Sequence, residues 1–189
     1  MRKLSNVLIF FGIAILALIF APVLKEETVY QARQIIKTPV DLTPPNKDFS
    51  IVIPKIAAIA PVVAGVDATD PKKYLSALRR GVAHAAGTSL PGQNGNVYLF
   101  AHSTDAFYNV TTYNAVFYLI GKLNKDDEIT IFYKGKEIKY KVYDKKVVSA
   151  DSSQYFGKIA DGKTLTLQTC YPPGTTLERL VVLAKEIGD

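Results

Sequence analysis

The chain contains a single cysteine, Cys170, which ends a strand-like run in the segment TLQTCYPPGTTLER, residues 166–179. Arg179 follows nine positions later and begins a second strand-like run, RLVVLAKEI. If the two strands are antiparallel neighbours, the end of the first and the start of the second lie at the same edge of the sheet. The spacing therefore predicts that the thiol and the guanidinium are close together, without deciding which face each side chain takes.

The chain has two histidines, and one of them also lies where a strand ends. His102 directly follows the strand-like run NVYLFA. If this strand runs parallel to the one that ends at Cys170, the imidazole joins the thiol and the guanidinium at the same edge of the sheet. The other histidine, His84, falls in GVAHAAGTSLPG, which we expect to be a loop.

A thiol, an imidazole and a guanidinium together suit acyl transfer through a thioester. An ordinary thiol has a pKa near 8.5, so only a few per cent of it is thiolate at neutral pH. A nearby imidazole can take the thiol proton and later protonate a leaving amine. An arginine can donate hydrogen bonds to the developing oxyanion or to the substrate backbone.

Each of the three residues also has an ordinary structural interpretation. A single cysteine at a strand end can be a small buried side chain, a histidine can be a polar loop residue, and an arginine can be a surface charge. Spacing along the chain leaves these alternatives open.

Composition excludes some classes of function. The net charge is +6, but the basic residues are spread out, and those at 134, 136, 139 and 141 alternate as on a solvated strand face. A nucleic-acid surface needs a denser basic patch with interleaved aromatic residues. No cluster of ligands predicts a metal site, no cofactor is expected, and one cysteine cannot form an intramolecular disulfide.

The N-terminus has the pattern of a membrane anchor. Residues 7–24 carry no charge and are nearly all apolar, a length close to the thickness of a bilayer's hydrocarbon core. Arg2 and Lys3 precede this run, which predicts a cytoplasmic N-terminus and an extracytoplasmic remainder. A cleaved signal peptide is the alternative, but Ile19–Phe20–Ala21–Pro22 is a poor cleavage site. We therefore expect an uncleaved anchor over residues 1–24.

The rest of the chain divides into a linker and a folded domain. Residues 25–48 are polar and contain three prolines, which predicts a semi-extended linker with room for a short helix over 26–37. Residues 49–189 contain about seven or eight short strand-like runs and one or two helices, one of them beginning after Asp70. This pattern predicts a mainly β fold, a closed or nearly closed barrel.

These segments resemble the sortase family, the cysteine transpeptidases of bacterial cell surfaces. Residues 166–170, TLQTC, are similar to the family's T-L-x-T-C strand, and Arg179 in ERLVVLA is similar to the arginine that opens the next strand. His102 in NVYLFAHS is similar to the histidine after the fourth strand. GVAHAAGTSLPGQNGN is similar to the family's segment between helix and strand. The resemblance covers about residues 49–187.

The resemblance implies a closed eight-stranded barrel with Cys170, His102 and Arg179 as catalytic residues. It also implies cleavage of a C-terminal sorting signal of the L-P-x-T-G kind after the threonine, with the acyl group held on the cysteine as a thioester. An amine then collects the acyl group. The implied partners are secreted proteins or pilins that carry the signal, and as acceptor a peptidoglycan precursor or a pilin lysine, at the cell membrane.

Five further positions are compared with the family through the same resemblance. Thr169 matches the family's threonine before the nucleophile and is expected to help position substrate or oxyanion. His84 matches a histidine that many members carry outside the catalytic group, with a structural or substrate-adjacent role. Ala101 stands where the family usually has glycine, and Ser103 where it often has arginine. Asp105 is expected to have no catalytic role.

Two other functions are consistent with parts of the pattern. An L,D-transpeptidase also uses cysteine, histidine and arginine outside the membrane, but its cysteine follows a glycine, which the segment Gln168–Thr169–Cys170–Tyr171 lacks. A non-catalytic binding module on a membrane stalk is the second alternative, and it requires the thiol to be packed in the core.

Overall fold

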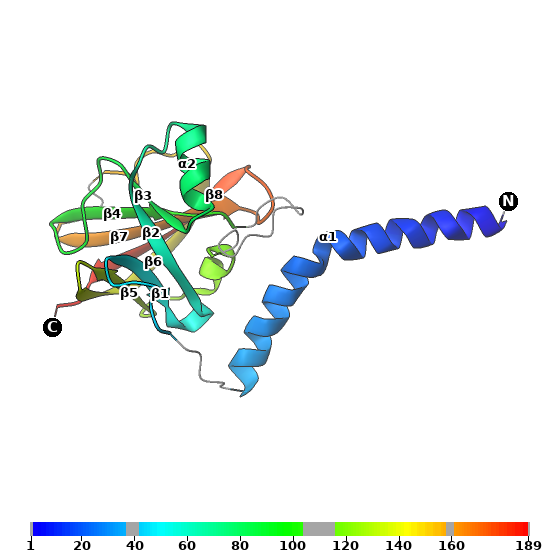
Figure 1. Cartoon of the computed structure of the whole chain (residues 1–189), viewed down its shortest axis with the longest axis horizontal. Helices are drawn as coiled ribbons and strands as arrows, with labels where there is room; N and C mark the ends of the chain where they lie inside the picture. The colour runs from blue at the N-terminus through cyan, green and yellow to red at the C-terminus, as the bar shows by residue number, and fades with distance from the viewer. Residues whose placement is uncertain (1, 37–41, 104–115, 158–160, 189) are drawn as a thin grey trace. The chain divides into compact units, whose positions relative to one another are not determined.

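Eight strands close into a barrel in the second of the two units into which the chain divides (Figure 1). The structure is a computed structural model, and it describes residues 2–36, 42–103, 116–157 and 161–188. The first unit comprises Met1–Pro39 and the second Val40–Asp189. The barrel lies within residues 49–189, where the sequence predicted the folded domain.

The first unit contains one long helix, α1 (Arg2–Ile36). Residues 23–38 contain neither proline nor glycine, so nothing in that stretch interrupts the helical ladder. One exposed pair, Gln31 Nε2 donating to Glu27 Oε1 at 3.0 Å, adds a contact one turn apart. The predicted linker, 25–48, therefore begins as helix. In the described part of the chain, no helix reaches the combined length and apolar character that membrane crossing requires.

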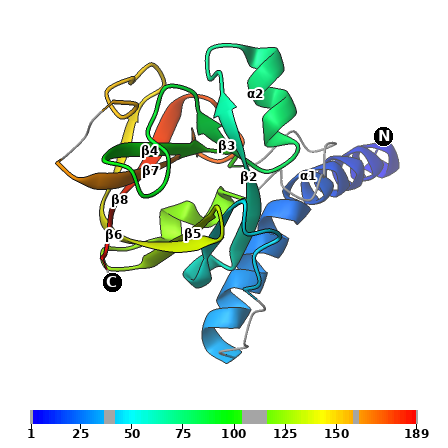
Figure 2. The same cartoon turned by 60° about the vertical axis from the view of Figure 1, so that its left-hand side comes forward.

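The barrel has the strand order β1-β2-β3-β4-β7-β8-β6-β5, and β5 pairs with β1 to close it (Figure 2). Only two of the pairings among the described strands are parallel, β2 with β3 and β4 with β7. The strands are β1 (Phe49–Ile53), β2 (Ala58–Val66), β3 (Val82–Ala85), β4 (Gly95–Phe100), β5 (Glu128–Tyr133), β6 (Lys136–Ser149), β7 (Lys163–Tyr171) and β8 (Glu178–Glu186), with short 3₁₀ helices at Pro54–Ile56 and Tyr118–Lys122. The predicted eight-stranded closed barrel is confirmed.

The sequence missed one strand, β3, because the segment around His84 was expected to be a loop. β3 has only four residues, too few to show an alternating pattern, and all four are buried. It pairs with β2 on one side and with β4 on the other. β5 and β6 form a hairpin, and its two turn residues, Lys134 and Gly135, both have positive φ, as in a type I′ turn.

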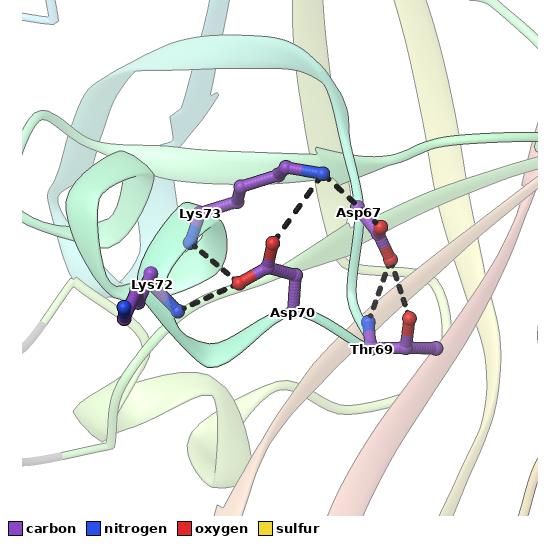
Figure 3. A network of polar contacts seen from close by, with 5 residues as sticks. All are labelled: Asp67, Thr69, Asp70, Lys72 and Lys73. Atoms are coloured by element: carbon purple, nitrogen blue, oxygen red, sulfur yellow. Dashed lines mark hydrogen bonds and ion pairs between the residues drawn. The ribbon is translucent and has the colours of Figure 1, made fainter.

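Helix α2 (Pro71–Leu78) makes the crossover between the parallel strands β2 and β3, and it begins where the sequence predicted. The Asp70 carboxylate accepts hydrogen bonds from the backbone N–H groups of Lys72 and Lys73, at 3.0 and 3.3 Å (Figure 3). The Lys73 ammonium pairs with Asp70 at 3.3 Å and with Asp67 at 3.6 Å (Figure 3). This exposed network fixes the start of the helix rather than forming a site, since both carboxylates and the Lys73 ammonium are paired with one another.

Candidate active site

Cys170 and Arg179 are direct cross-strand partners. β7 and β8 are antiparallel, and their register pairs these two residues near the end of one strand and the start of the other. Side chains of directly opposite residues lie on the same face of a sheet. The predicted antiparallel neighbourhood is confirmed, and the register adds what the spacing left undecided, namely that thiol and guanidinium leave the sheet on the same side.

His102 comes level with Cys170 through the parallel pairing of β4 with β7. The register pairs Phe100 with Gln168, and the Ala101 N–H donates to the Gln168 carbonyl at 3.1 Å, which continues the ladder past the end of β4. One more step places His102 beside Cys170. The parallel arrangement on which the prediction depended is therefore present.

This row of three residues lies on the outer face of the barrel. Along β7 and β8, fully buried side chains such as Leu167 and Val182 point inward, and the positions between them include Lys185, which is exposed. Cys170 and Arg179 belong to this second set, and both are partly exposed. His102 is partly exposed as well. The free thiol is therefore not enclosed in the core. The alternative of a packed structural cysteine requires an enclosed thiol, so the exposure of Cys170 speaks against it.

The Arg179 side chain is supported by the loop between β7 and β8. Its Nη1 donates to the carbonyls of Thr176, at 3.1 Å, and of Glu178, at 2.9 Å. The loop is itself braced, because the N–H and the hydroxyl of Thr175 both donate to the Pro172 carbonyl, at 3.0 and 2.8 Å. Within the described residues nothing accepts from Nη2 or Nε, so these donors remain for a ligand.

Thr169 lies on the opposite face from Cys170 and is buried. Its hydroxyl donates to the Ala101 carbonyl at 2.9 Å, the peptide group that leads into His102. Ala101 is also buried and does not have a positive φ, so this backbone conformation does not require glycine. The next residue after the histidine, Ser103, is 1% exposed.

The His84 side chain is buried and both of its ring nitrogens have hydrogen-bond partners. It is 3% exposed, and its Nδ1 accepts from the Gly65 N–H at 3.3 Å. Nε2 therefore carries the proton, and it lies 3.1 Å from the Ser89 carbonyl and 3.0 Å from the Thr88 hydroxyl. Burial lowers the pKa of His84, and the hydrogen bond to Ser89 opposes this only in part. The ring is thus held neutral between β2 and the segment after β3.

We predict that His84 makes the barrel less stable in mild acid. Because the pKa is lower in the folded than in the unfolded chain, the unfolded chain binds more protons, and stability falls as the pH drops below about 6.5. A chain with His84→Gln should lack this contribution while being less stable at pH 8. Denaturant unfolding at pH 8, 7, 6 and 5 measures both; parallel pH profiles for the two proteins would contradict the prediction.

The outer face next to the row of Cys170, Arg179 and His102 contains a group of residues that the sequence did not single out. The Tyr98 hydroxyl donates to Gln168 Oε1, and the Tyr98 ring stacks on Phe156, with centroids 4.1 Å apart and planes 14° from parallel. Phe156 belongs to the connection between β6 and β7. Alternation along NVYLFA would have placed Asn96, Tyr98 and Phe100 on the histidine's face, but nothing in the sequence indicated what covers them.

Asn96 anchors that connection to the barrel. Its Nδ2 donates to the Tyr155 carbonyl at 2.8 Å, and its Oδ1 accepts from the hydroxyls of Thr164 and Thr166, at 3.2 and 3.1 Å. The amide is 3% exposed, so these bonds are well shielded from water. The connection is therefore fixed over the outer face of β4 and β7 at Tyr155 and, through the aromatic stack, at Phe156.

A pocket of about 530 Å³ lies at the starts of β4 and β7, the far end of these strands from Cys170. It is lined by residues 87–89, 94–96, 156–157 and 161–162. Within the described ranges, no three acidic, cysteine or histidine side chains are grouped as metal ligands. Asp105, expected to have no catalytic role, lies outside the described residues.

Comparison with known proteins assigns the family. The sortase domain model matches residues 51–187. Sortase D of Bacillus subtilis (strain 168) is 29% identical over 138 residues, which are 71% of this chain and 61% of that protein. A solved Sortase D5 transpeptidase of Clostridium perfringens is 26% identical with a TM-score of 0.61, covering 84% of this chain and 88% of that one.

A further solved structure, sortase C-1 of Actinomyces oris, is 29% identical with a TM-score of 0.61 and covers 88% of this chain and 85% of that one. The relatives belong to different sortase classes, so no class is assigned. Because the domain model covers nearly the whole barrel, including the strands that carry Cys170 and Arg179, the chain belongs to the sortase family.

Proposed function

We propose that this protein is a cysteine transpeptidase that cleaves a C-terminal sorting signal and transfers the acyl group to an amine. Cys170 is the nucleophile, His102 the general acid and base, and Arg179 the donor that stabilises the oxyanion or binds the substrate backbone. The observation that carries the proposal is the single row on the outer face of the barrel, where the register aligns the three positions across β4, β7 and β8.

In the first half-reaction, the Cys170 sulfur attacks the carbonyl carbon of the scissile peptide bond. The thiol proton passes to His102, and the carbonyl oxygen becomes an oxyanion. Arg179 donates to this oxyanion through the N–H groups that the loop carbonyls leave unused. The carbon–nitrogen bond then breaks, His102 protonates the leaving amine, and the acyl group remains on the sulfur as a thioester.

In the second half-reaction, an amine attacks the thioester carbonyl. His102 takes a proton from the amine, the carbon–sulfur bond breaks, and the thiol is restored. Water in place of the amine gives hydrolysis instead. The cycle needs no oxidant or reductant, since each half-reaction exchanges one acyl bond for another.

Thr169 positions the histidine in this scheme instead of touching substrate. Its hydroxyl is bound to the Ala101 carbonyl on the inner face, which holds the peptide group before His102 against β7. The sequence had assigned Thr169 to substrate or oxyanion. His84, which the resemblance gave a structural or substrate-adjacent role, is buried with both ring nitrogens bonded, which supports the structural role.

We further propose that the donor signal is of the L-P-x-T-G kind and that the acceptor is an amine of a peptidoglycan precursor or of a pilin. Membership of the sortase family supports this substrate class. Similarity to sortases D, D5 and C-1 does not distinguish attachment to the cell envelope from pilin polymerisation.

The test is to incubate the full chain with a library of donor peptides, including L-P-x-T-G variants and a peptidoglycan stem tetrapeptide. Intact mass should show one acyl fragment, ending at the threonine, added to the protein and removed by an added amine. Acylation by the stem peptide alone would instead indicate an L,D-transpeptidase activity. If no donor forms an adduct with the protein, the alternative of a non-catalytic binding module would be favoured.

We also propose that the protein is held in the cell membrane by residues 1–24, with its N-terminus in the cytoplasm and the barrel outside. The uncharged run 7–24 behind Arg2 and Lys3 supports this. Protease added to intact cells should digest the barrel and spare an N-terminal tag. Protection of the barrel until the cells are lysed would contradict this orientation.

A further inference from the structure

The row of residues next to Cys170 on the outer face differs in character from the catalytic row. It contains Phe100 of β4, Gln168 of β7 and Val181 of β8, which the register pairs with one another. Phe100 and Val181 are buried apolar side chains, 8% and 0% exposed, whereas Gln168 is partly exposed. A polar amide thus interrupts an apolar surface two residues before the nucleophile.

The Gln168 amide is held in one orientation. The Tyr98 hydroxyl donates to its Oε1, and Tyr98 is fully buried beneath Phe156. Burial raises the pKa of Tyr98 above the usual range of a phenol, although the nearby Arg179 charge opposes the shift, so the hydroxyl keeps its proton and remains a donor. With Oε1 occupied as an acceptor, the Nε2 group points its two N–H donors elsewhere, and no described residue accepts from them.

Along the outer face, an acyl donor can leave Cys170 in either of the two directions of β7. Beyond the cysteine, β7 ends at Tyr171, and the chain turns into the braced loop that supports Arg179. In the other direction, the outer face of β4 and β7 continues under Phe156 to the pocket at the starts of these strands. In that direction the partly exposed Gln168 is the next side chain along the row from Cys170, so a donor that extends this way passes over its amide.

The repeat of an extended peptide matches the spacing of these two side chains. Cys170 and Gln168 are two residues apart on one strand, so their Cβ atoms are separated by about 6.6 Å. In an extended donor, carbonyls two residues apart point the same way and repeat at about the same distance. When the scissile carbonyl faces the sulfur, the carbonyl two residues before it faces the Gln168 amide.

We propose that Gln168 is a specificity-determining residue for the acyl donor, which donates a hydrogen bond to the backbone carbonyl two residues before the scissile residue, and that Tyr98 positions its amide. This rests on the proposed transpeptidase function. In a donor of the L-P-x-T kind, the recognised group is the proline carbonyl. Gln168 thus fixes the register of the donor against the nucleophile through a backbone group, whatever side chain occupies x.

The test compares three donor peptides that differ only at the backbone bond between the proline and the residue x of an L-P-x-T donor. The parent has an amide there, the second an ester, which keeps the carbonyl but lacks the N–H, and the third an alkene, which lacks both. For the full-length wild-type chain, the ratio of kcat/KM for ester to alkene should be about 5- to 10-fold, the worth of one hydrogen bond. The loss should fall mainly on KM, because the bond also forms in the ground state.

Two variants separate recognition from structure. Gln168→Leu should lower kcat/KM for the parent donor by the same factor and reduce the ester-to-alkene ratio to about 1. Tyr98→Phe keeps the stacked ring, removes only the hydroxyl, and should reduce the ratio partially. Gln154→Leu replaces an exposed glutamine in the connection between β6 and β7 and should leave the ratio unchanged. Thermal unfolding confirms that each protein is folded.

The outcomes separate a failure of the role of Gln168 from a failure of the proposed transpeptidase function. Acylation of the wild type by the parent donor with an equal ester-to-alkene ratio in wild type and Gln168→Leu would overturn the role of Gln168 alone. Absence of any acyl-enzyme with the parent donor would overturn both. If Gln168→Leu does not fold, the wild-type ratio and the Tyr98→Phe ratio still decide, since a ratio near 1 in the wild type excludes the hydrogen bond.

Discussion

Replacing Cys170 by alanine is expected to abolish acyl-enzyme formation and leave the barrel intact. The chain has no second thiol, so no other side chain can take over the thioester step. Removal of a nucleophile that acts together with its base costs about 10⁴-fold or more in turnover. The sulfur lies on the partly exposed outer face, where alanine leaves no internal cavity, so the free energy of unfolding should change by less than about 1 kcal/mol.

Intact mass after incubation with a reactive donor, together with denaturant unfolding, measures both parts of this prediction. Ser153→Ala, which changes an exposed residue, is the control for the loss of one small polar side chain. Thr164→Ala is unsuitable for this purpose, because the Thr164 hydroxyl donates to Asn96. Iodoacetamide provides an independent check, since it should label the wild-type thiol readily. A variant that still turns over donor at the wild-type rate would rule out the thioester mechanism, and slow labelling would favour the non-catalytic module.

The candidate site could be predicted from the sequence because each of its residues lies at a strand end. Strand ends are visible in a single sequence when an apolar alternating run stops at a proline, a glycine or a polar residue, as it does after Cys170. Whether two such ends meet depends on strand order and direction, which the sequence does not determine. The predicted site therefore depended on two assumptions, that the strand ending at Cys170 is antiparallel to the strand of Arg179 and parallel to the strand before His102. The structure fulfils both conditions, since β7 is antiparallel to β8 and parallel to β4.

Other features could not be predicted because they depend on contacts between distant segments. β3 is a strand through its pairing with β2 and β4, not through any local pattern in its four residues. The bond from Thr169 to the Ala101 carbonyl joins residues 68 positions apart. The Tyr98–Gln168 pair and its cover, Phe156, require the connection between β6 and β7 to fold back over the sheet. The sequence thus indicated the candidate reacting groups but not the residues that pack around them.

Changing Arg179 to lysine is expected to impair acylation severely although the positive charge is kept. The guanidinium divides its donors: Nη1 binds two loop carbonyls, whereas no described residue accepts from Nη2 or Nε, which face the substrate in the proposed mechanism. An ammonium has three donors on a single nitrogen at the end of a flexible stem, so it cannot hold the loop and present a fixed pair of N–H groups at once. We expect kcat/KM for the donor to fall by about 10²- to 10³-fold, the usual cost of losing an oxyanion donor.

Arg80→Lys makes the same chemical change at an exposed position after α2 and serves as the matched control, with kcat/KM expected to remain at the wild-type level. Thermal unfolding of both variants separates catalytic loss from loss of the loop contacts. If Arg179→Lys retained near-normal kinetics, the role of Arg179 would be reduced to its charge, because only the charge survives the substitution. A loss confined to KM would instead assign the guanidinium to binding of the donor backbone, since oxyanion stabilisation acts on kcat.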